Sequence, residues 1–222
     1  MASTSHDTHD TEAVPTEHGD ARITWHGRDR AARGVLLLGH GAGGGIEAPD
    51  LQALAAGIDS FAVALVEQPW RVAGKRLAPA PRTLDAGWAP VMTRVRAAVG
   101  EGVPILVGGR SAGARVACRT GAATGAAGVL ALAFPLHPPG KPERSRAEEL
   151  LATALPTLVV QGARDPFGAP EEFPPLPKRT HRLVGLDAGN HAFAVRKSEA
   201  EVLPELVAAV ATWVETVERA VR

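Results

Sequence analysis

Three residues that together could form a nucleophilic catalytic site each follow a different apolar run of the sequence. They are Ser111, Asp165 and His191. A serine hydroxyl is a poor nucleophile near neutral pH, so it needs a histidine to take its proton and an acid to orient the histidine. Apolar runs of this kind predict buried strands, and parallel strands end at one edge of a sheet, where sites are assembled. The sequence therefore predicts a catalytic triad of these three side chains.

The surroundings of Ser111 favour its role as the nucleophile. Residues 109–113 read Gly-Arg-Ser-Ala-Gly, between an apolar run and a segment compatible with a helix. In such a turn the serine adopts a strained backbone conformation, and Gly109 and Gly113 let the strand and the helix pass closely. The alternative is a glycine-rich turn with a purely structural serine.

The acid and the histidine also have structural alternatives. Asp165 precedes Pro166 and could be a turn residue, and His191 could close a Gly-Asn turn. Asp187 is a rival acid, but it stands in the same loop as His191. The agreement of three positions at three predicted strand ends favours Asp165 as the acid.

The glycine-rich segment 39–45 (GHGAGGG) is expected to supply the oxyanion hole. A glycine-rich turn brings the backbone close enough to a reacting carbonyl to donate N–H groups. We assign the two donors to the amides of Ala42 and Ala112. His40 is expected to be structural and to pin the loop.

The same segment supports a rival function, a dinucleotide-dependent oxidoreductase. Gly39, Gly41 and Gly44 spell G-x-G-x-x-G, and Glu67 ends the next apolar run, where an acid could hold an NAD ribose. However, the helix is expected to begin only near Pro49, whereas a dinucleotide loop enters its helix at once. This reading also leaves the predicted triad unexplained.

The substrate pocket must be formed by loops at the same edge of the sheet. Its candidate residues are Trp70, Arg71, His137 and Phe167, each with packing as the alternative role. Arg71 and Arg110 could select a carboxylate or phosphate, although long arginine side chains commonly face water. Residues 135–156 are too few for a large lid, which favours a small, soluble acyl substrate over a long-chain lipid.

The elements expected to position these residues alternate between strands and helices, the pattern of an α/β fold. It is a mostly parallel twisted sheet with helices on both faces. Apolar residues at helical spacing place Trp88, Met92 and Trp213 in the core. The predicted strands cover residues 22–25, 35–38, 61–66, 105–108, 128–134, 157–161 and 182–186.

Composition limits the remaining possibilities. The 222 residues carry 24 Lys+Arg and 24 Asp+Glu, so no net charge attracts the chain to nucleic acid or to a membrane. A single cysteine, Cys118, excludes an intramolecular disulfide and is compatible with the cytoplasm. We expect it to be a small core residue.

The acidic first 20 residues lack the basic and apolar regions of an export signal, and we expect them to form a disordered tail before a single domain at 21–222. His6, His9 and His18 of this tail are expected to be solvated rather than metal ligands. We expect neither a cofactor nor a metal.

Several segments resemble the small α/β-hydrolases, which also have the chain order serine, acid, histidine. The segments are GHGAGGG, EQPWRVAGKR, GGRSAGAR, FPLHPPGKPE, QGARDPFG and AGNHAF. They are similar to the predicted hydrolases grouped with the testis-expressed and non-specific-lethal-complex subunit homologues, relatives of dienelactone hydrolases. The resemblance implies the α/β-hydrolase fold without a large cap and a triad at Ser111, Asp165 and His191, but no agreed substrate. Dienelactone hydrolases use a cysteine where this chain has Ser111.

These patterns predict a serine hydrolase that cleaves an ester or a similar acyl bond of a small molecule through an acyl-enzyme. The alternative from another class is a catalytically idle hydrolase fold used for protein binding. A scaffold, however, has no need of three catalytic residues at three strand ends.

Overall fold

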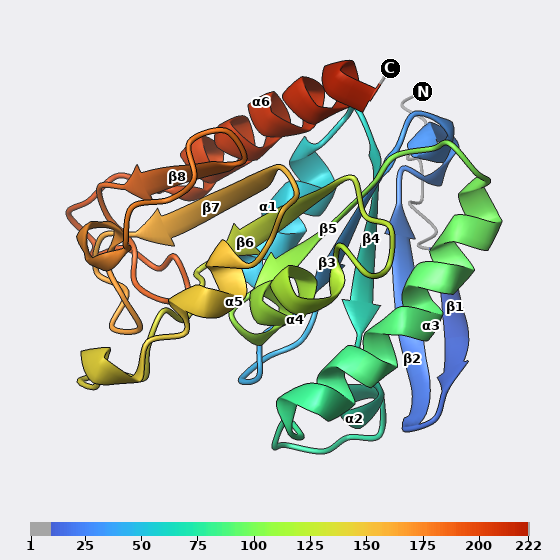
Figure 1. The fold of residues 1–222 in the computed structure, drawn as a ribbon, viewed down its shortest axis with the longest axis horizontal. Coiled ribbons are helices and arrows are strands. Elements are labelled where there is room, and N and C mark those ends of the chain that lie inside the picture. The colour runs from blue at the N-terminus through green and yellow to red at the C-terminus, as the bar shows by residue number, and fades with distance from the viewer. Residues whose placement is uncertain (1–9, 222) are drawn as a thin grey trace, which may run out of the picture.

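The computed structural model describes residues 10–221, and its centre is one eight-stranded sheet in the order β1-β2-β4-β3-β5-β6-β7-β8 (Figure 1). The strands from β4 to β8 in this order are parallel, while β2 pairs antiparallel with both β1 and β4. The strands are β1 (Asp10–Thr16), β2 (Gly19–His26), β3 (Val35–Gly39), β4 (Ala62–Glu67), β5 (Ile105–Arg110), β6 (Gly128–Leu132), β7 (Thr157–Gly162) and β8 (His181–Leu186).

Helices cover both faces of the sheet, which explains why the central strands are continuous apolar runs rather than alternating ones. In β3 and β6 every residue is buried. The helices are α1 (Pro49–Gly57), α2 (Pro69–Val72), α3 (Pro81–Val99), α4 (Ala112–Thr120), α5 (Ala147–Leu151) and α6 (Leu203–Val221). Short 3₁₀ turns occur at Arg28–Ala32, Pro142–Arg144 and Pro170–Glu172.

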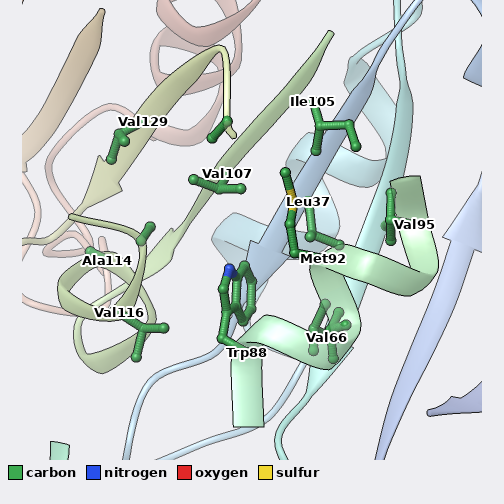
Figure 2. Packing of buried hydrophobic residues seen from close by; sticks show 14 of the residues in the cluster. Leu37, Val66, Trp88, Met92, Val95, Ile105, Val107, Ala114, Val116 and Val129 are labelled. Carbon is green, nitrogen blue, oxygen red and sulfur yellow. The ribbon is translucent and has the colours of Figure 1, made fainter. Parts of the chain in front are cut away.

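The core is divided by the sheet into two layers, because successive side chains of a strand point to opposite faces. Leu37 of β3 packs in the layer beneath α3 and α4, and Leu36 packs in the layer formed with α1 and α6. Figure 2 shows the first layer, in which Trp88 and Met92 of α3 lie against the sheet beside Leu37 and Ile105. Trp213 is buried in the second layer. The core positions predicted from helical spacing are therefore confirmed.

The predicted fold class is confirmed, and each predicted strand is present with small differences at its ends. The largest difference is in β2, which was expected over residues 22–25 but begins at Gly19 and ends at His26. Strand β6 was expected to reach Phe134 but ends at Leu132. Ala133 has a φ of 44°, a left-handed conformation that leaves the extended region and ends the strand. The segment between β6 and β7 holds only a 3₁₀ turn and α5, so there is no large lid over the described residues.

The expectation of a disordered tail over residues 1–20 is wrong for residues 10–20, which form β1 and the start of β2. An antiparallel edge strand needs little apolar surface, because its backbone pairs with the neighbouring strand. Val14 is the buried side chain of β1. Glu12 accepts hydrogen bonds from Trp25 Nε1 and from Arg94 Nε of α3, each at 2.8 Å, so this acid is not part of a solvated tail.

The prediction for residues 1–9, which include His6 and His9, lies outside the described residues. His18 is described, and its Nε2 lies 3.1 Å from Glu17 Oε1. None of the helices within residues 10–221 combines the length and the apolar character needed to cross a bilayer.

Candidate active site

Ser111 stands in a strained turn between β5 and α4. Its φ of 52° and ψ of −111° define a backbone conformation that residues other than glycine rarely adopt. A Cβ atom added to Gly109 or Gly113 would lie 2.2 or 2.4 Å from the Gly39 carbonyl oxygen of β3. The two glycines therefore allow the turn to pack against β3, as the spacing predicts, and the strain is held in place by this packing.

The three predicted triad side chains lie in direct contact. Ser111 Oγ lies 2.9 Å from His191 Nε2, and His191 Nδ1 lies 2.8 Å from Asp165 Oδ2. Because a carboxylate only accepts hydrogen bonds, His191 Nδ1 carries the proton, and Nε2 is left to accept the hydroxyl proton of Ser111. This arrangement provides a base for the serine and an acid that fixes the tautomer of the base.

The Asp165 carboxylate is buried and fully engaged. Besides the contact with His191, Oδ2 accepts a hydrogen bond from Gln161 Nε2 at 2.9 Å, and Oδ1 accepts one from the Phe167 amide at 2.9 Å. Gln161 Nε2 also donates to the Gly168 carbonyl oxygen at 2.7 Å. Gln161 therefore holds both the acid and the loop that carries it.

Gln161 was missed by the sequence analysis. The signal that could have identified it is a polar residue near the end of the apolar run that forms β7, four positions before Asp165. A buried polar side chain costs free energy unless it is hydrogen-bonded, so a polar residue at such a position indicates a specific partner.

The rival acid Asp187 does not contact the histidine. Asp187 is exposed at the end of β8, whereas His191 Nδ1 faces Asp165. The Arg164 N–H donates to the Gly189 carbonyl oxygen and ties the loop that carries His191 to the loop after β7.

The loop after β3 is pinned by His40. The buried His40 ring accepts a hydrogen bond at Nε2 from the Gln68 amide (3.1 Å), and its Nδ1 donates to the Gly41 carbonyl oxygen (2.8 Å). Burial lowers the pKa of His40, which keeps the ring neutral as this bonding requires. The predicted structural role of His40 is confirmed.

The two predicted oxyanion donors belong to the loop after β3 and to the first turn of α4. Ala42 is exposed in the His40-pinned loop and lines the same cleft as Ser111. Ala112 is the first residue of α4, so its N–H has no acceptor within the helix. Both amides belong to segments that begin at the carboxyl edge of the sheet, directly after β3 and β5.

An open cleft of about 270 Å³ surrounds the serine. Phe167 packs on the imidazole of His191, with 4.2 Å between the ring centroids. Phe167 is thus the predicted substrate residue that the structure brings to the triad. The cleft is lined by Gly41, Ala42, Gly43, Arg110, Ser111, Pro166, Asn190, His191 and Ala192.

Phe167 is not among these lining residues, and neither are the other three predicted substrate residues. Trp70 is buried behind the loop after β3, against the ring of His40. Arg71 Nη2 donates to Glu47 Oε1 at 3.1 Å on the surface. His137 is buried, with its ring nitrogens 2.9 Å from the Pro138 carbonyl oxygen and 3.0 Å from Glu172 Oε2.

Neither a dinucleotide nor a metal has a matching site among the described residues. The loop after β3 does not enter a helix at once, because α1 begins at Pro49, and Glu67 accepts a hydrogen bond from Arg22 (3.2 Å). No group of three His, Cys, Asp or Glu residues within 10–221 is arranged to hold a metal ion. Cys118 is buried on α4, and burial raises its pKa to about 12, so its thiol is not a nucleophile at this site.

Known proteins with similar sequence or structure share this fold. A family described as "Alpha/beta hydrolase domain" matches residues 32–218. A lidless α/β serine hydrolase from Xanthomonas campestris is 17% identical, with 94% of each chain covered and a TM-score of 0.71. A Pyrococcus furiosus esterase is 14% identical (94% of this chain and 91% of that one, TM-score 0.73). A dienelactone hydrolase from Anabaena variabilis is 15% identical (94% and 97%, TM-score 0.69).

Proposed function

The chain belongs to the alpha/beta hydrolase domain family, and from this premise we propose that it is a serine hydrolase that cleaves an ester or a similar acyl bond of a small molecule. The observation that carries the proposal is the pair of contacts Ser111–His191 (2.9 Å) and His191–Asp165 (2.8 Å). Three strand ends have to converge to make these contacts, and a purely structural serine does not require them.

The proposed reaction has two halves. Ser111 Oγ attacks the acyl carbon while His191 Nε2 takes the hydroxyl proton, and the same proton passes to the leaving alcohol, which gives an acyl-enzyme. A water molecule then attacks the acyl carbon, with His191 again taking the proton and returning it to Ser111 Oγ. Asp165 stabilises the imidazolium in both halves.

The developing negative charge on the acyl oxygen is stabilised, in this proposal, by the amides of Ala42 and Ala112. Such donors act in a fixed geometry and need no reorganisation during the reaction. Elsewhere, loss of one oxyanion donor has reduced the rate by roughly 10²–10³. The position of Ala112 at the start of α4 supports this role, because the helix dipole also favours negative charge there.

The size of the cleft supports a small substrate. Its volume of about 270 Å³ lies just below the range for small-molecule sites, roughly 300–1,000 Å³. Residues 10–221 form no large lid over it, and Phe167 beside His191 offers an apolar contact for the leaving group or the acyl chain. The structurally similar esterase and dienelactone hydrolase described above are compatible with a small ester substrate for this chain.

Within the family, we further propose kinship with the predicted hydrolases grouped with the testis-expressed and non-specific-lethal-complex subunit homologues. The segments HPPGKPE and QGARDPFG support it, since they are more specific than the turn around Ser111. The dienelactone hydrolases share the fold but use a cysteine nucleophile, so the activity proposed here is that of a serine enzyme.

Labelling with a fluorophosphonate probe tests the proposal. We expect the wild-type protein to be labelled at Ser111 and to hydrolyse short p-nitrophenyl esters, and we expect Ser111→Ala to do neither. Ser198→Ala is the matched control, because Ser198 is an exposed serine of the loop before α6, and it should be labelled like the wild type. A native wild-type protein that is not labelled would contradict the proposal and favour the idle scaffold.

A further inference from the structure

Arg110 immediately precedes Ser111, and the proposed triad does not account for the contacts of its side chain. Arg110 Nε donates to Asp50 Oδ2 at 3.0 Å, and Nη2 donates to the main-chain carbonyl oxygen of His191 at 2.6 Å. The side chain is only 12% exposed, although it lines the cleft. One guanidinium group thus joins α1, the nucleophile turn and the loop that carries the histidine.

The partner of Arg110 on α1 is an unusually buried acid. The Asp50 side chain is 0% exposed in the first turn of the helix. Burial raises the pKa of Asp50, and the charge of Arg110 opposes this change. A buried carboxylate is costly unless it is paired, so the two side chains hold one another in place.

The same guanidinium group also lies beside the loop after β3. A Cβ atom added to Gly41 would lie 3.2 Å from Arg110 Nη1, which places this nitrogen against the backbone of the loop. The planar group therefore contacts the segments that carry the base, the nucleophile and the proposed oxyanion donor Ala42. A planar fork of donors can bridge several segments in this way, whereas a lysine ammonium group cannot keep the same geometry.

We propose that Arg110, held by Asp50, is a positioning residue that fixes the His191 loop relative to Ser111. This inference rests on the proposed hydrolase function. It replaces the alternative, left open by the sequence, that Arg110 selects an anionic substrate, because Asp50 already balances the charge of the guanidinium group. A carboxylate or phosphate would have to compete with a buried acid for the same cation.

The expected effect of losing the bridge is a loss of turnover. When reacting groups are misplaced by about 1 Å, the rate can fall by roughly 10²-fold. We therefore expect Arg110→Met to lower kcat by about 10- to 100-fold, with KM for a neutral ester changed by less than about threefold. The loss should be the same for a neutral ester and for a matched ester that carries a carboxylate.

Four further variants separate positioning from charge and from stability. Arg110→Lys keeps the charge but not the bridge and should remain impaired. Asp50→Asn should lower kcat in the same direction, and the double variant with Arg110→Met should lose less than the product of the two single losses. Arg119→Met is the control, because Arg119 is similarly buried (19% exposed) and paired with Asp85 on α3, away from the cleft. It should lose stability without losing kcat.

Rescue of kcat by an added small molecule distinguishes a positioning role of Arg110 from a purely structural one. Arg110→Ala should regain part of its kcat when guanidinium chloride is added at concentrations that do not unfold it, and methylammonium chloride should restore less. Circular dichroism and thermal melts establish that each variant is folded. If Arg110→Met does not fold, Arg110→Lys takes its place in the comparison.

Several outcomes would overturn the inference. A kcat of Arg110→Met equal to that of the wild type would do so, and so would an effect confined to KM for the anionic ester. If the kcat loss of the double variant equals the product of the two single losses, Asp50 does not act through Arg110, and that part of the inference is wrong. Failure of the proposed function looks different, since the wild-type protein itself would then be neither labelled nor active.

Discussion

At the scale of single residues, the position of His191 depends on how its acid is held. The oxygens of Asp165 accept hydrogen bonds from three donors: His191 Nδ1, Gln161 Nε2 and the Phe167 amide. With these donors in place, the carboxylate is fixed in one orientation, and the imidazole follows it. Gln161 does not contact Ser111, but it orients Asp165, and Asp165 in turn orients His191.

Gln161→Met tests this support. Methionine fills a similar volume but cannot donate, so the carboxylate loses one hydrogen bond of a kind worth roughly 1.5–3 kcal/mol. We expect kcat for a short ester to fall by about tenfold with little change in KM, measured by steady-state kinetics. Gln52→Met is the control, because Gln52 Nε2 donates to the Ile46 carbonyl oxygen at the surface. Equal kcat values for Gln161→Met and the wild type would show that Asp165 needs no such support.

The triad residues could be predicted from the sequence, whereas most of the pocket could not. Ser111, Asp165 and His191 stand just after apolar runs, so the topology of a parallel sheet brings them to one edge. The place of Trp70 depends instead on the path of a long connection, and that of His137 on which neighbours its ring finds after the chain has turned. Neither path leaves a periodic signal in the sequence.

At the scale of the elements, ion pairs join the helices that cover one face of the sheet. Arg119 of α4 donates to Asp85 of α3 and to Glu149 of α5, and Arg115 of α4 donates through two nitrogens to Glu149. Desolvation by burial works against the charged form of Glu149, but the hydrogen bonds and charges of the two arginines outweigh it. The pKa of Glu149 therefore lies below its ordinary value.

The lowered pKa of Glu149 predicts a dependence of stability on pH. A carboxyl group with a lower pKa in the folded state stabilises the protein above its ordinary pKa, here 4.5, and this contribution is lost as the pH falls through the folded-state value. We expect Glu149→Gln to lower the free energy of unfolding by roughly 1–3 kcal/mol at neutral pH. The difference from the wild type should shrink in urea titrations carried out progressively below that pH. A difference that stays constant into acid would contradict this account.

Among the elements, the strands of the parallel sheet were predictable because they are buried on both faces and read as uninterrupted apolar runs. Strand β1 was missed for the opposite reason. It is an edge strand with a single buried side chain, Val14, and its acids resemble those of a solvated tail. What holds it is backbone pairing with β2 and the contacts of Glu12, and neither can be read from local composition.

At the scale of the whole molecule, the proposed triad lies at an edge of the sheet that the connection from β6 to β7 leaves open. The connection from β6 to β7 contains only short elements, and the cleft around Ser111 opens to solvent. A substrate can therefore reach the serine without a preceding movement of a cap. Enzymes with a lid must instead open it before the substrate binds.

The open edge predicts a rate that depends on dissolved substrate alone. With tributyrin, hydrolysis should rise up to the solubility limit and then level off, because residues 10–221 form no cap for a lipid surface to displace. In a p-nitrophenyl series from acetyl to palmitoyl, kcat/KM should be highest for the short acyl groups. A sharp rise in activity at the appearance of an emulsion, measured by titration of the released acid, would contradict both the open edge and the small-substrate reading.

The backbone of Ser111 has a consequence for how this protein can change. A conformation of this kind costs about 1–3 kcal/mol, which the surrounding fold has to supply. Glycine would accept the same angles at no such cost, so Ser111→Gly should raise the stability of the fold while it removes the proposed nucleophile. Selection for thermal stability alone would therefore favour glycine at position 111, and the proposed activity would be lost.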